Sequence, residues 1–191
     1  MKIDAKTAAD IGVALNEATF LGAEYDPDRN LFGTTFSVLT LAEDDSPGPS
    51  DPRRQIVFSD VGRISAALRD RSWEVLSAET VPFGVSDMLS IVQSFGGLPI
   101  YSWEFINNDD PALEQWEGRL SLDIAPPNGS LDNRINLFQE AVYRHLDLWV
   151  WFDEIHIRDA SGNEMILSDF IAGGKRWWDA FSAGELEAGS D

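Results

Sequence analysis

Short β-favouring runs, each ended by a cluster of turn residues, dominate this chain and restrict the folds open to it. Residues 18–41 place two such runs around the turn-rich stretch 26–33, which predicts a β-hairpin. Residues 55–68 are again strand-like, with a β-bulge expected near Gly62. Further strands are predicted at 101–106, 119–124 and 148–152, and a hairpin turn at 159–163. Because these strands follow one another in hairpins, the pattern predicts a mainly antiparallel α+β fold.

The residue patterns of two of these strands predict which of their faces are buried. In 119–124 the alternation places Leu120, Leu122 and Ile124 inward and the residues between them, including Ser121, toward water. Residues 148–152 are apolar on both faces, which predicts a buried central strand. In such a strand Trp149 and Trp151 share a face.

About three short helices are expected beside the sheets. One is predicted over 86–97, with Ser86 as its N-cap and Gly96-Gly97 as its end. A second is predicted over 132–146, where apolar residues recur every three or four positions. A third is predicted over 175–181, after a capped segment at 168–174 that ends in two glycines.

The 191 residues are 43% apolar, which is enough to build one compact domain over 1–184. The acidic end, 185–191, is expected to be a flexible tail. A weak internal similarity allows two related β units within 1–80 and 98–184. The proline-rich stretch 43–54 is expected to be a mobile surface loop.

The charge balance excludes several partners. The chain has 14 basic and 33 acidic side chains, a formal charge of −19. Nucleic acids and anionic membranes are therefore poor partners. The chain has no apolar run long enough to span a membrane and no apolar signal region near its start, so a cytoplasmic location is expected. The acidity is explained by a soluble surface, by a high-salt habitat, or by an acidic face that docks a basic partner.

The sequence offers little ordinary catalytic chemistry. It has no cysteine, and His145 and His156 are its only histidines, so no metal site and no cofactor are predicted. The turn beginning at Asp26 has Leu31 and Ser37 where a calcium loop needs Gly and Glu. No nucleophile elbow and no complete phosphate loop are present.

Seven tryptophans remain, and most are expected in the core. Trp177 and Trp178 are adjacent, so one of them can serve as an exposed anchor for a partner. We therefore expect a non-enzymatic module, immunity- or inhibitor-like, that binds a basic protein. The alternative is a hydrolase that uses carboxylates in a cleft. The candidate partner-binding residues are Trp177, Trp178, Glu43, Asp44, Asp45, Asp109 and Asp110.

Overall fold

The computed structural model describes residues 2–43, 51–70, 80–105 and 120–186. The elements in this part of the chain are, in order, α1 (Ala5–Leu15), β1 (Thr19–Asp26), β2 (Leu31–Ser37), β3 (Arg53–Ser59), β4 (Arg63–Arg69), a short 3₁₀ turn (Val85–Asp87), α2 (Met88–Gln93), β5 (Ile100–Phe105), β6 (Leu122–Ile124), β7 (Asn133–Ala141), β8 (Arg144–Phe152), β9 (Glu154–Arg158), β10 (Glu164–Met165) and α3 (Leu167–Ser182).

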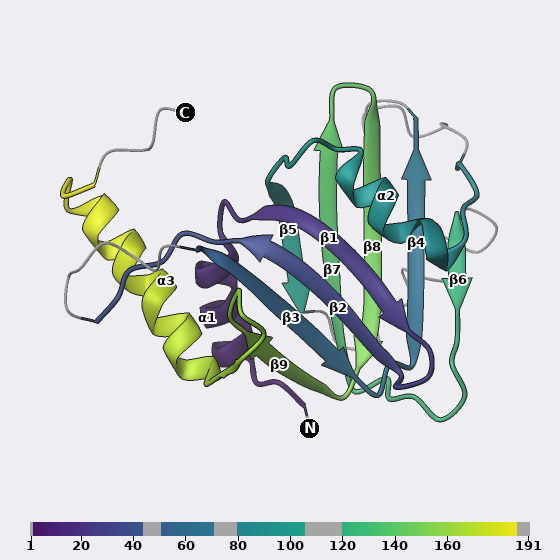
Figure 1. The fold of residues 1–191 in the computed structure, drawn as a ribbon, viewed down its shortest axis with the longest axis horizontal. Helices are drawn as coiled ribbons and strands as arrows, with labels where there is room; N and C mark the ends of the chain where they lie inside the picture. The colour runs from purple at the N-terminus through teal and green to yellow at the C-terminus, as the bar shows by residue number, and fades with distance from the viewer. Residues whose placement is uncertain (1, 44–50, 71–79, 106–119, 187–191) are drawn as a thin grey trace.

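The strands form two sheets. The first has the order β1-β2-β3-β9-β10 and the second β5-β7-β8-β4-β6, with antiparallel pairing between neighbours. In Figure 1 the strands of the first sheet cross those of the second, while α1 and α3 lie together at one side. The predicted α+β class with mainly antiparallel sheet is confirmed. Each sheet takes strands from both halves of the chain, so neither half builds a sheet alone.

Two long bent strands connect the sheets. One runs through β3 and β4 and the other through β8 and β9, and the two pair along both parts. Ser59 lies opposite Glu154 and Arg63 opposite Trp151, so three residues face two across the bend. This one-residue excess is a bulge, and it lies where one was predicted, beside Gly62. Such a bend lets one strand serve two sheets that cross at an angle.

The core fills the space between the sheets. Phe58 of β3 and Phe152 of β8 face each other across it with ring centroids 4.6 Å apart. Phe20 and Phe36 stack at 4.9 Å within the first sheet. These rings belong to one buried apolar cluster that also includes residues of α1, α2 and α3.

The two predicted hairpin turns are confirmed. Strands β1 and β2 pair from Asp26 and Leu31 outward. The Asp26 carboxylate accepts the backbone N–H groups of Asp28 (3.0 Å) and Arg29 (3.1 Å), as a turn-forming Asp does. At 159–163 the chain turns between β9 and β10, which are also antiparallel.

The helix predicted over 132–146 is wrong, because these residues form the β7–β8 hairpin. Ile135 and Leu137 face the core in alternation, whereas Phe138 lies on the opposite face beside His145. Val142, which completed the helical spacing, lies in the connection between the strands and is 76% exposed. Pairing with β5 on one side and β4 beyond β8 gives this hairpin partners that a local pattern does not reveal.

The predicted strand at 148–152 is confirmed, since β8 lies between β7 and β4. The strand predicted over 101–106 is found as β5, and residue 106 lies outside the described residues. Residue 119 of the strand predicted over 119–124 lies outside the described residues, and within 120–124 the strand is Leu122–Ile124, which pairs with β4. Ser121, expected to face water, is buried.

The helix predicted over 86–97 is present but begins later than expected. Ser86 lies inside the 3₁₀ turn, and the Asp87 carboxylate accepts the Gly84 N–H (2.9 Å). Helix α2 follows at Met88, and Gly96 and Gly97 have positive φ after its end, as predicted for terminating glycines.

Two helices, α3 and α1, differ from what the sequence pattern predicts. The glycines at 173–174 do not separate two segments, because α3 runs through them without a break. A Cβ on Gly174 would lie 2.6 Å from the Ala14 Cα, so Gly174 permits close packing of α3 on α1, whereas Gly173 faces Thr40 and Leu41. The sequence pattern does not predict α1, although the Asp4 side chain caps it by accepting the Thr7 N–H (2.9 Å).

Candidate binding surfaces

The predicted anchor residues lie on the last two turns of α3. Trp177 and Trp178 contact edge to face at 4.8 Å between ring centroids. Phe181 stacks on Trp177 at 5.2 Å and meets Trp178 at 5.7 Å. All three side chains are half-buried. We call Trp177, Trp178 and Phe181 the aromatic cluster; the i, i+4 spacing of Trp177 and Phe181 was the available signal for its third member.

The aromatic cluster follows the fully buried part of α3 along the helix. The last fully buried residue of the helix is Gly174. Figure 1 shows this end of α3 extending away from the sheets. The indole N–H of Trp178 is enclosed but has no hydrogen-bond acceptor among the described residues. A ring system of this kind, partly covered and with an unused donor, can accept a further contact.

The chain that follows β2 is fastened to α3 beside this cluster. Leu41 donates its N–H to the Gly173 carbonyl (3.1 Å), and its carbonyl accepts from the Arg176 guanidinium (3.1 and 3.2 Å). Glu43, two residues further along, is exposed. The contact with α3 is thus made by Leu41, two residues before Glu43. The other predicted acids, Asp44, Asp45, Asp109 and Asp110, lie outside the described residues.

The two tryptophans of β8 pack against arginines of the neighbouring strands β7 and β4. Trp149 and Trp151 share a face of β8, as predicted, with ring centroids 6.4 Å apart. The buried Arg134 guanidinium lies 4.8 Å from the Trp149 ring and 5.6 Å from the Trp151 ring. Arg63 also lies 5.5 Å from Trp151 and forms a two-bond ion pair with Asp123 (both 2.8 Å). These rings are held by cation–π contacts within the chain.

Asp147 is the described carboxylate whose environment most resembles that of a catalytic acid. Burial raises its pKa, while His145, Arg69 and the Asn136 side chain act to lower it. No second carboxylate contributes to the pKa shift of Asp147 among these described neighbours. The paired carboxylates of the hydrolase hypothesis are therefore not found at this residue.

His156 and Glu154 of β9 share a face, with Nε2 and Oε2 3.8 Å apart. Within the described ranges no group of three or more His, Cys, Asp or Glu side chains could hold a metal ion.

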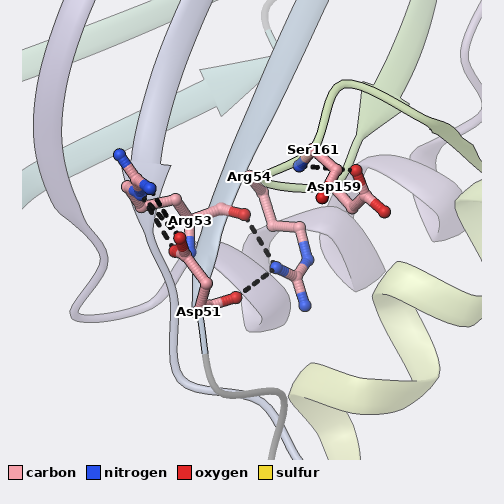
Figure 2. Close-up of polar contacts among 5 residues, drawn as sticks. All are labelled: Asp51, Arg53, Arg54, Asp159 and Ser161. Carbon is pink, nitrogen blue, oxygen red and sulfur yellow. Dashed lines mark hydrogen bonds and ion pairs between the residues drawn. The ribbon is translucent and has the colours of Figure 1, made fainter.

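A small cleft separates the start of β3 from the β9–β10 turn. Its volume is about 200 Å³, and its lining is Thr35, Arg53, Arg54, Gln55, Asp159, Ala160 and Gly162. Figure 2 shows the Asp51 carboxylate bonded to the Arg53 guanidinium, while the Arg54 side chain extends toward α3. The hydrogen bonds from Arg53 lower the pKa of Asp51 to about 2. No local residue pattern indicates this cleft, because its two sides lie about a hundred positions apart in the sequence.

Comparison with protein family models, curated proteins and solved structures finds no match to this chain. In the described part of the chain, no helix is both long and apolar enough to cross a membrane.

Proposed function

We propose that the protein is a non-enzymatic binding module that docks a basic protein through the aromatic cluster of α3. The observation that carries this proposal is the contact of three half-buried aromatic rings after the fully buried part of the helix. Tryptophan is enriched among the residues that dominate binding energy at protein interfaces. An immunity- or inhibitor-like role is the most concrete form of this function.

The charged residues around the aromatic cluster indicate the sign of the partner's charge. Asp179 and Glu185 are exposed at this end of α3, and the exposed Glu43 follows two residues after Leu41, which is bonded to Arg176. The whole chain carries −19, so the field at long range is negative. A basic surface would be attracted to this end of the molecule, and its apolar groups would then cover the rings.

A capture experiment tests the proposal directly. The wild-type protein and the Trp177→Ala/Trp178→Ala variant are immobilised and exposed to lysate from the source cells. Ile166→Ala is the matched control, because Ile166 is an exposed apolar residue at the opposite end of the same helix. We expect a basic protein to be retained by wild type and control and lost from the double variant. Equal retention by all three proteins would contradict the proposal.

Association and dissociation rate constants for the purified partner separate the contribution of charge to binding from that of the tryptophans. Raising salt from about 0.05 to 0.5 M should slow association, because the Debye length shrinks from roughly 14 to 4 Å. Replacing either tryptophan by alanine should instead speed dissociation, by an amount equivalent to about 2 kcal/mol or more. Association that ignores salt, with dissociation unchanged in both variants, would remove the basis of the proposal.

The hydrolase alternative rests on Asp147, whose raised pKa is the property expected of a general acid. It requires a second carboxylate to act with it, and the binding proposal does not involve Asp147. An Asp147→Asn variant should therefore bind the partner as wild type does. Loss of a measured hydrolytic activity in this variant, with partner binding absent throughout, would favour the enzyme.

A further inference from the structure

Asn128 and Gly129 form the only asparagine–glycine pair in the sequence, and they lie in the connection between β6 and β7. Asn128 is in a turn, with an exposed side chain and a φ of +65°, a left-handed conformation that asparagine adopts more readily than most residues. Gly129 has no side chain that would shield its backbone nitrogen. The amide carbon of Asn128 can therefore meet this nitrogen without steric hindrance from the following residue.

Neither of these two groups is held by a hydrogen bond. The Asn128 side chain and the Gly129 N–H have no hydrogen-bond partner in the described part of the chain. Asn30 provides a comparison, because it has the same left-handed backbone, with a φ of +52°. Its side chain, however, accepts the Tyr25 hydroxyl (3.0 Å), and the bulky Leu31 follows it. The two asparagines thus share a backbone conformation and differ in the freedom of the side-chain amide and in the size of the next residue.

We propose that Asn128 is a site of spontaneous deamidation through the backbone of Gly129. The Gly129 nitrogen gives up its proton and attacks the Asn128 amide carbon. The new C–N bond closes a succinimide ring, and the amide nitrogen leaves with the proton as ammonia. Water then cleaves one of the two C–N bonds of the ring. Cleavage of the new bond gives aspartate, whereas cleavage of the original peptide bond gives isoaspartate, and water is the only co-reactant.

The packing of Gly129 determines what each product does to the fold. A Cβ on Gly129 would collide with the Val61 carbonyl oxygen. Ser130 pairs with Val61 and donates its N–H to the Asp60 carbonyl (2.7 Å), so this loop is fastened to the bend between β3 and β4. Isoaspartate adds one carbon to the main chain, which such close packing does not accommodate without strain. Aspartate leaves the main chain unchanged and adds only an exposed charge. Isoaspartate should therefore loosen the joint between the two sheets, and aspartate should not.

Peptide mapping of the full-length protein after incubation in mildly alkaline buffer tests the proposal. Trypsin releases residues 120–134 as one peptide, which holds both Asn128 and Asn133. Asn133 is the internal control, because its buried side chain accepts the Ile3 N–H (2.7 Å) and donates to the Asp153 carbonyl (2.6 Å). Fragmentation of this peptide should place the change from amide to acid at Asn128 and leave Asn133 intact.

The products and one variant identify the route. Ring opening gives isoaspartate together with aspartate, whereas direct hydrolysis of the amide gives aspartate alone. Asn128→Gln keeps an exposed amide but must close a larger ring, so its deamidation should be slower by about tenfold or more. Asn30, examined in the same digest, should remain an asparagine.

Stability measurements separate the two products. Asn128→Asp supplies the aspartate product directly and should unfold at the same urea concentration as wild type. The isoaspartyl protein, separated by chromatography, should unfold at a lower urea concentration than Asn128→Asp does. Equal stability of these two proteins would contradict the argument from the packing of Gly129.

Three results would overturn the deamidation site itself. One is an unchanged Asn128 in the folded protein under conditions that deamidate it in the urea-unfolded chain, which would show that the fold protects the pair. A second is aspartate as the sole product. The third is deamidation of Asn128→Gln as fast as that of wild type.

Discussion

The hydroxyl of Ser121 satisfies both backbone groups of Leu68 where the pairing of β6 with β4 ends. It accepts the Leu68 N–H (2.8 Å) and donates to the Leu68 carbonyl (3.2 Å). Ser121→Ala should lower the free energy of unfolding by about 1–3 kcal/mol, because a buried N–H loses its acceptor. Urea denaturation measures this loss. The exposed Ser161→Ala should change stability by less than about 0.5 kcal/mol, and an equal effect of both substitutions would contradict the argument.

Asp147 should make stability depend on pH. Burial raises its pKa, so the folded protein binds this proton more tightly than the unfolded chain does. Its ionised form destabilises the fold; the penalty is absent below the unfolded pKa and complete above the folded pKa. Each unit of pKa difference corresponds to about 1.4 kcal/mol.

The amide of Asp147→Asn cannot ionise, so the variant should gain stability relative to wild type as the pH rises. Urea denaturation between about pH 4 and pH 7 measures that gain, since the unfolded pKa is about 3.9. A stability difference that stays constant across this range would show that the carboxylate is not penalised by burial.

At the scale of elements, the close contact between α1 and α3 depends on the absence of a side chain at Gly174. A Cβ at Gly174 would lie 2.6 Å from the Cα and 2.8 Å from the Cβ of Ala14. Gly174→Ala should therefore destabilise the protein by about 1–3 kcal/mol through overpacking, against the roughly 1 kcal/mol that alanine gains over glycine in a helix. Thermal and urea unfolding measure the net effect.

Ser182→Ala is the control for this substitution, because Ser182 is exposed at the end of the same helix. It should change stability by less than about 0.5 kcal/mol. A Gly174→Ala protein more stable than wild type would mean that the two helices can separate without cost.

At the scale of the whole molecule, the net charge of −19 opposes compactness. Raising salt from about 0.05 to 0.5 M should increase the unfolding free energy, because screening weakens repulsion among the acids more in the compact state. NaCl and KCl should act equally if screening is the cause. Stability that falls with either salt would indicate that the ion pairs, such as Arg63–Asp123, outweigh this repulsion.

Local residue patterns are sufficient to predict the strands that end in clear turn residues or are apolar on both faces. The β1–β2 hairpin has Asp26 to cap its turn, and β8 is apolar enough to be recognised as central. The position of the bulge beside Gly62 and the aromatic pair Trp177–Trp178 are also local features. In each case the physical cause, turn chemistry or burial on both faces, acts within a few residues.

Contacts between distant segments decided the rest. Residues 133–141 fit a helical spacing, but β5 and β8 supply the hydrogen bonds that make them a strand. Gly174 would weaken an isolated helix, yet the approach of Ala14 requires it. Arg54 and Asp159 line one cleft because β3 pairs with β9. Strand pairing and close packing depend on partners far away in sequence, so only the tertiary structure determined these elements and the cleft between them.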